Sequence, residues 1–163
     1  MNKFILICLI CFVFSKRSVS KNGLKLIKEF EGCKLTAYYD CADVITIGYG
    51  TTNADKAITG TTIKPGMTIS QATAEKWLEA SLDKKYAPLV NKYDSKYSWT
   101  QNEFDALISF AYNIGNIDQL TAKGTRDKKT IANKMLEYCK AGGKKREGLV
   151  RRRKAERDLF LKK

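Results

Sequence analysis

The chain has 163 residues, enough for one domain or for two small lobes that share a core. Its hydrophobic share of 44% and aromatic share of 10% are typical of a folded globular protein and exclude a disordered one. The formal net charge of +13 favours encounters with polyanions, but the basic residues are spread along the chain and select no partner alone.

Histidine is absent from the sequence. This excludes Ser-His-Asp and Cys-His nucleophile systems, together with the usual zinc sites that contain histidine. An enzyme of this composition would depend mainly on carboxylates for acid–base chemistry, and we expect it to need no metal or cofactor.

The longest apolar run extends over the eleven residues from Phe4 to Phe14, short of the roughly 18 that a membrane-spanning helix needs. Lys3 precedes the run, and Ser18 and Ser20 supply small residues before a cut, which is the layout of a secretory signal peptide. We predict a signal peptide over 1–20 and a secreted mature chain, with a retained anchor as the alternative. Residues 1–20 contain three basic residues and no acid, so the mature chain keeps a charge of +10.

The mature chain, 21–163, begins with a mixed lobe of about 21–67. Glycine commonly ends helices, and β-branched residues flanked by turn residues favour strands. The expected elements are a helix capped by Asn22 and ended by Gly32, strands at 35–39 and 44–47 joined by a turn at 40–43, a third short strand at 61–64, and a closing turn at Pro65-Gly66.

The remaining part, about 68–163, is predicted to be a larger helical lobe. Capping-box patterns and apolar residues at helical spacing place its helices. They are expected from Thr68 to an end or kink at Pro88, from the box at Thr100–Glu103 to Gly115, from Thr130 to Lys140 before Gly142-Gly143, and from Gly148 to Leu161. The predicted fold class is therefore α+β, with a small sheet lobe before a helical one.

Glu31, Asp40 and Thr46 are the candidate catalytic residues. Glycoside cleavage without metal or cofactor usually needs one carboxylic acid that protonates the leaving oxygen and a second group that holds water or attacks. Glu31 ends the first helix, Asp40 ends the first strand and Thr46 lies on the returning strand, so all three can face one cleft. These residue types within 16 positions are commonplace, and their spacing alone is weak evidence.

The residues around this cluster resemble the phage-type lysozyme family, glycoside hydrolase family twenty-four. The family signature is a Glu, eight residues, an Asp or Cys, five residues and a Thr, and positions 31, 40 and 46 match it without insertion. The similar blocks are Gly23–Gly32 with Thr46–Thr52, Glu103–Gly115, and Ala141–Gly143 with Gly148–Glu156. The resemblance covers about 22–162.

This resemblance implies a lysozyme-like fold with a cleft between two lobes. It also implies inverting hydrolysis of the β-1,4 bond between N-acetylmuramic acid and N-acetylglucosamine in peptidoglycan. Glu31 would be the general acid, and Asp40 with Thr46 would position or activate water. The implied supporting residues are Arg151 as the partner of Glu31, with Arg152 as its rival, and Thr52, Tyr112 and Asn113 along the saccharide cleft.

Three cysteines, Cys33, Cys41 and Cys139, follow the predicted signal peptide. In an oxidising compartment two of them could pair, and the connectivity cannot be derived from the sequence. A bridge that stiffens the hairpin and a bridge from Cys41 to Cys139 are two hypotheses, and free thiols are the third.

The expected partner is bacterial peptidoglycan, with no specific nucleic acid and no stable membrane span after signal removal. We expect a monomer that acts outside the producing cell, or in the periplasm or at the host wall if the source is a phage. Three alternatives stay open: a glycosidase for chitin-like polymers, a lytic transglycosylase, and a non-catalytic cationic antibacterial or wall-binding protein.

Overall fold

The computed structural model describes residues 17–163. The apolar run from Phe4 to Phe14 therefore lies outside the described residues. The elements are α1 (Lys21–Glu31), β1 (Lys34–Tyr39), β2 (Ile45–Gly48), β3 (Thr51–Thr52), the short 3-10 turn η1 (Asn53–Asp55), α2 (Lys56–Thr59), α3 (Gln71–Ser81), the π-helical turn η2 (Leu82–Tyr86), α4 (Ala87–Asn91), α5 (Asp94–Tyr97), α6 (Gln101–Ile114), α7 (Lys128–Met135), β4 (Lys140–Ala141), β5 (Lys144–Lys145) and α8 (Glu147–Leu161).

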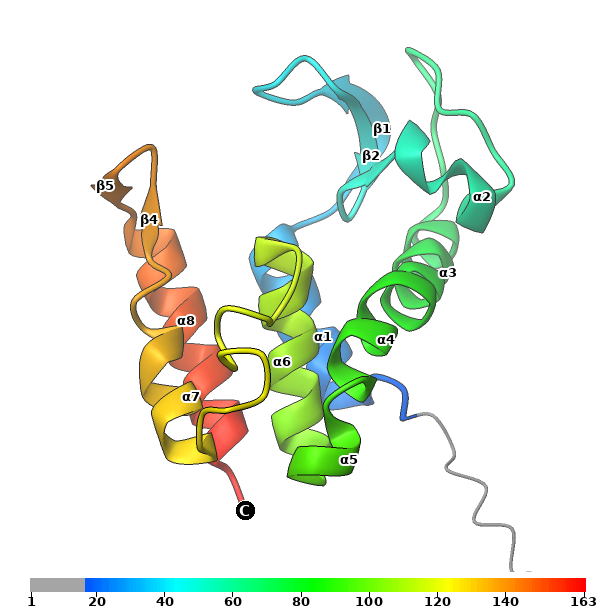
Figure 1. The fold of residues 1–163 in the computed structure, drawn as a ribbon. Coiled ribbons are helices and arrows are strands. Elements are labelled where there is room, and N and C mark those ends of the chain that lie inside the picture. Colours follow the sequence, from blue (N-terminus) through cyan, green and yellow to red (C-terminus); the bar gives the residue numbers. More distant parts are fainter. Residues whose placement is uncertain (1–16) are drawn as a thin grey trace, which may run out of the picture.

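The helices form one group around α6, and the three-stranded sheet lies at one end of this group (Figure 1). Helices α1 and α4 contact one side of α6, α8 packs along another, and α7 packs against α8. No helix within residues 17–163 is both long and apolar enough to cross a membrane.

The sheet confirms the predicted hairpin but not the predicted third strand. β1 pairs antiparallel with β2 across the turn at 40–43, and β2 pairs with Thr51–Thr52 rather than with 61–64. Gly48 and Gly50 have φ values of +66° and +103°, which glycine adopts without strain, and they turn the chain back at once. The segment near Ile63 is held instead by the Asn53 side chain, whose amide bonds both the Ile63 N–H and its carbonyl.

Helix α1 starts one residue before its predicted cap. Ser20, not Asn22, is the N-cap: its hydroxyl accepts from the backbone N–H groups of Asn22 and Gly23. The same hydroxyl donates to Asp105 of α6, whose Oδ1 also accepts from the Ser20 N–H at 2.9 Å. A Cβ on Gly23 would lie 2.7 Å from Asp105, so the helices approach closely here because residue 23 is glycine. Gly32 ends α1 as predicted.

Other helix boundaries also differ from the predicted ones, including the start of α7 at Lys128 rather than Thr130. Ser70, rather than Thr68, caps α3, and five π-helical residues separate α3 from α4, which has Pro88 in its first turn. Helix α7 ends at Met135 instead of Lys140, because the chain turns into the hairpin β4–β5 with Gly142-Gly143 at its tip. The capping box of α6 at Thr100–Glu103 and its end at Gly115 are as predicted.

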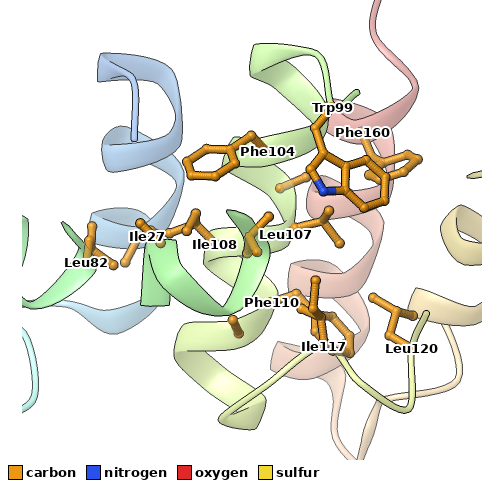
Figure 2. Packing of buried hydrophobic residues seen from close by; sticks show 14 of the residues in the cluster. Ile27, Leu82, Trp99, Phe104, Leu107, Ile108, Phe110, Ile117, Leu120 and Phe160 are labelled. Carbon is orange, nitrogen blue, oxygen red and sulfur yellow. The ribbon is translucent and has the colours of Figure 1, made fainter. Parts of the chain in front are cut away.

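The main hydrophobic core lies between α6 and the helices around it, as Figure 2 shows. Residues 103–111 of α6 are all buried, so this helix is apolar or internally paired around most of its circumference. Trp99 stacks on Tyr97 at 4.2 Å between ring centroids and meets Phe160 of α8 edge-on at 6.0 Å. These contacts fix α8 against α6 near the C-terminus.

A buried group of charged side chains fixes the other half of α8. Glu156 is fully buried and accepts from Ser109 Oγ of α6 at 2.7 Å, and its Oε1 also accepts from Arg152 Nε and an Arg153 terminal nitrogen at 3.0 Å each. Arg152 reaches across to the Ser109 carbonyl at 3.0 Å. Burial raises the pKa of Glu156, opposed by the neighbouring guanidinium groups of Arg153 and Arg152. Burial likewise lowers the pKa of Arg153 to about 10, opposed by Glu156.

Replacing this buried carboxylate should lower the stability of the fold strongly. Glu156→Gln leaves the buried Arg153 without a counter-charge and leaves Arg152 with Glu31 alone, so we expect a loss of about 3–5 kcal/mol in the free energy of unfolding, measured by denaturant titration. Asp158→Asn on the same helix is the matched control. Its side chain is 68% exposed and 3.7 Å from Arg157, so its loss should stay within about 0.5 kcal/mol. Equal losses in both variants would contradict the prediction.

Candidate active site

Glu31 lies at the last position of α1, before the chain enters the sheet. Its carboxylate pairs with a terminal nitrogen of Arg152 from α8 at 2.6 Å. The Glu31 side chain is 21% exposed while that of Arg152 is 4% exposed, so the carboxylate is open to a ligand and its cationic partner is not. Glu31 Oε1 has this partner, and the part of the chain described by the structure provides no hydrogen bond to Oε2.

The partner of Glu31 is Arg152, and the prediction of Arg151 is wrong. Arg151 is exposed and lies in the lining of the pocket that contains Glu31, without pairing with it. One helix residue rotates a side chain by about 100°, so an error of one position exchanges an inward side chain for an outward one. The buried Glu156 one turn later marks the inward face, since it pairs with Arg152 at the i,i+4 spacing.

Asp40 begins the hairpin turn and Thr46 lies on the central strand. Asp40 Oδ1 accepts from the N–H groups of Ala42 and Val44 at 2.8 and 2.9 Å, which fixes the turn and leaves the carboxylate half-buried. Thr46 is 4% exposed, pairs with Tyr38 on one side and Thr52 on the other, and its hydroxyl donates to the Val44 carbonyl at 2.9 Å. Both side chains are therefore held by the same turn.

Strand β1 connects Glu31 to this turn, and it is irregular. Lys34 opposes Gly48 while Tyr38 opposes Thr46, so β1 has two more residues than β2 over this stretch. Such a bulge bends a strand and redirects its side chains. The bend lies between Glu31 and Asp40 in the sequence, and it therefore affects how the two carboxylates are oriented.

Tyr112 and Tyr86 form an aromatic pair near Glu31. Their ring centroids are 5.0 Å apart, and the Tyr112 hydroxyl donates to the Tyr49 carbonyl at 2.7 Å. Burial, followed by the negative charge of Glu31, raises the pKa of Tyr112 well above its usual range. Burial also raises the pKa of Tyr86. Tyr112 is thus a neutral hydrogen-bonded residue whose role includes packing. Tyr86 was not predicted from the sequence, because a lone tyrosine before Pro88 gives no signal of it.

The other two predicted cleft residues differ in their placement. Asn113 lines an open pocket of about 390 Å³ together with Glu31, Arg146, Arg151 and Arg152. Its side-chain oxygen accepts from Arg153 at 3.1 Å. Thr52 is half-buried and caps η1, accepting from the Ala54 N–H at 3.3 Å, so its observed role is structural.

Cys33 and Cys41 are exposed free thiols, and Cys139 is a partly buried one. Neither of the hypothesised bridges is present between these three residues. Burial raises the pKa of Cys33, partly offset by a hydrogen bond from Tyr49. The thiols near Glu31 and Asp40 are therefore not constraints on the hairpin in this structure.

Comparisons with known proteins agree on one family. The phage lysozyme family model matches residues 28–156. The endolysin of Lactococcus phage c2 is 44% identical over 146 residues, covering 88% of this chain and 60% of the relative. The endolysin of Salmonella phage P22 is 32% identical, covering 88% and 97%. The chain spans 60% of the Lactococcus phage relative and 54% of the endolysin of Bacillus phage B103.

Two solved structures are similar throughout. An endolysin from Escherichia coli O157:H7 phage FAHEc1 has a TM-score of 0.72 at 39% identity, covering 89% of this chain and 94% of that one. A mutant of P22 lysozyme has a TM-score of 0.68 at 29% identity, covering 90% of this chain and 99% of that one. With its small sheet, its helical group around α6 and Glu31 at the end of α1, the chain belongs to the phage lysozyme family.

Proposed function

We propose that the chain is a peptidoglycan hydrolase that cleaves the β-1,4 bond between N-acetylmuramic acid and N-acetylglucosamine. The observation that supports this most directly is the Glu31 carboxylate, held by the buried Arg152 at the edge of an open pocket. The names of the relatives, endolysin and lysozyme, agree with this activity. The substrate is a wall glycan in this proposal, and no metal or cofactor takes part.

Glu31 acts as the general acid in this mechanism. Arg152 binds Oε1, so Oε2 is the oxygen that holds the proton and delivers it to the leaving glycosidic oxygen. The ion pair with Arg152 orients the Glu31 carboxyl group and limits its rotation. This keeps Oε2 directed at the leaving glycosidic oxygen.

Asp40 and Thr46 handle the attacking water. Asp40 Oδ1 is occupied by two backbone N–H groups, so Oδ2 is the oxygen that accepts a proton from water. The Thr46 hydroxyl already donates to a carbonyl and offers its lone pairs to the same water. Attack from the face opposite Glu31 inverts the anomeric centre, and an inverting enzyme holds its two carboxyl groups roughly 6.5–9.5 Å apart in the working complex.

Glu31→Gln should abolish hydrolysis and preserve wall binding. The amide keeps the size of the side chain but has no proton to deliver, so release of reducing ends from purified peptidoglycan should fall by about 10²–10⁴-fold or more. Sedimentation with intact sacculi should be unchanged. Undiminished killing of bacteria by this variant would instead indicate a charge-based, non-enzymatic mechanism.

Asp40→Asn tests the water-positioning carboxylate separately from the turn. The amide oxygen can still accept from Ala42 and Val44, so the unfolding free energy should change little while hydrolysis falls by about 10²–10⁴-fold. Asp43→Asn in the same turn is the control: residue 43 is exposed with φ +59°, which asparagine tolerates, and activity should be retained. Anhydro-sugar products, or cleavage of chitin at an equal rate, would contradict the proposed reaction.

We also propose that residues 1–20 direct export as a signal peptide and that the mature protein acts outside the producing cell as a monomer. Ser20 caps α1 and Arg17 pairs with Asp94 at 3.4 Å, so a cut after residue 20 removes contacts of the folded domain. Loss of such a cap costs about 0.5–2 kcal/mol, and the cut also removes both hydrogen bonds from Ser20 to the buried Asp105.

Intact mass and thiol counting test the export proposal together. The exported protein should begin at Lys21 and show three reactive thiols after unfolding without reductant. A full-length mass with five thiols, including Cys8 and Cys11, would indicate a retained anchor and contradict cleavage.

A further inference from the structure

Six basic residues gather at the start of α8 and on the hairpin before it. We call them the hairpin surface: Lys140, Lys144, Lys145, Arg146, Arg151 and Lys154, all exposed. The ion pairs between residues 17 and 163 include none of the six. The hairpin projects beyond the helices at the same end of the molecule as the sheet (Figure 1). Glu147 is the single exposed acid within 140–154.

The sequence has two basic runs, Lys144–Arg146 and Arg151–Lys154, and the fold divides the second into internal and external charges. Arg152 and Arg153 turn inward and pair with Glu31 and Glu156. Their neighbours Arg151 and Lys154 turn outward and join the lysines of the hairpin. The cations on this surface are therefore not needed to balance charge inside the domain.

The hairpin surface continues into the pocket that contains Glu31. Arg146 and Arg151 line that pocket together with Glu31 and Asn113. A molecule bound across Arg146 therefore lies directly beside a glycan chain bound at Glu31. This continuity indicates that the partner of the surface is attached to the same wall as the substrate.

The chemistry of the surface favours phosphate over bases or lipid. Residues 140–154 include no aromatic side chain on which nucleic-acid bases could stack. The hairpin tip is Ala-Gly-Gly and offers no large apolar residue for insertion into a membrane interface. Lys140 and Lys145 oppose each other across the strands, a like-charge pair that an anion between them would relieve.

We propose that the hairpin surface binds an anionic wall polymer of repeating phosphodiesters, linked to the glycan that the active site cleaves. The proposal rests on the proposed function, because it places the glycan in the pocket at Glu31. The lysine ammonium groups bind phosphate oxygens as charge-assisted hydrogen-bond donors, and Arg146 connects the two binding regions. The binding recruits the enzyme to walls that have the polymer and should weaken steeply with salt.

The test measures binding of full-length Glu31→Gln protein to sacculi with the phosphate polymer intact and to sacculi stripped of it. The variant is Lys140→Gln with Lys144→Gln and Lys145→Gln. The matched control is Lys56→Gln with Lys64→Gln and Lys76→Gln, three exposed lysines on or near α2 and α3 with the same total charge. All six positions are exposed, so folding should be unaffected.

The hairpin variant should bind intact sacculi about tenfold to a hundredfold more weakly at low salt, and stripped sacculi as the parent does. The control should show less than a threefold change. An equal loss in the control would overturn the proposal in favour of diffuse charge. An equal loss on stripped sacculi would overturn it in favour of carboxylates on the peptide part of the wall.

Inorganic polyphosphate, duplex DNA and anionic vesicles serve as further probes at the same ionic strength. Polyphosphate should displace the parent protein from intact sacculi. The same polyphosphate should have less effect on the variant that lacks the three hairpin lysines. Tighter lysine-dependent binding to DNA or to vesicles would overturn the choice of a wall polymer. Hydrolysis is assayed separately, on stripped peptidoglycan, with a hairpin variant that keeps Glu31. Failure of the proposed enzymatic function would appear in this assay. Failure of the surface proposal would appear in the binding assays alone.

Discussion

Arg152 forms the connection on which the geometry of the candidate site depends. Its guanidinium joins Glu31 at the end of α1 to Ser109 of α6 and Glu156 of α8. A lysine could not make these contacts, since one ammonium cannot place donors toward several acceptors in a fixed planar fork. Three helices from distant parts of the sequence are therefore held by a single side chain, and Glu31 is oriented by the same contact.

The cost of burying this cation explains the composition around it. A buried charge is tolerated only when it is paired and hydrogen-bonded. Glu156 supplies the counter-charge, and Ser109 donates to Glu156 while its carbonyl accepts from Arg152. The second guanidinium, Arg153, shares Glu156 and extends to Asn113 at the pocket. The charged cluster thus holds α8 in place and brings Asn113 into the same network as Glu31.

Local patterns predicted the parts of the fold that local interactions determine. The capping box of α6, the glycine at the end of α1 and the turn at Asp40 depend on neighbouring residues, and all three are as predicted. The third strand was predicted at 61–64 but lies at Thr51–Thr52. The chain turns back at Gly48 and Gly50, so β2 pairs with the two residues that follow, a strand too short to recognise from β-branched residues. Ser20 was missed as the cap because part of its role is a contact with Asp105 in a distant helix.

The candidate site also combines features that are visible in the local sequence with features that depend on distant contacts. The spacing of Glu31, Asp40 and Thr46 could be recognised along the sequence, while the choice between Arg151 and Arg152 required knowing which face of α8 turns inward. The run Arg151–Lys154 has a basic residue at each of its four positions. The alternation of apolar and polar residues that normally identifies the inward face of a helix is therefore absent there. Once α8 is docked, the two middle members of the run and the two outer members acquire different roles. Arg152 and Arg153 hold the site from within, and Arg151 and Lys154 remain available to a partner outside.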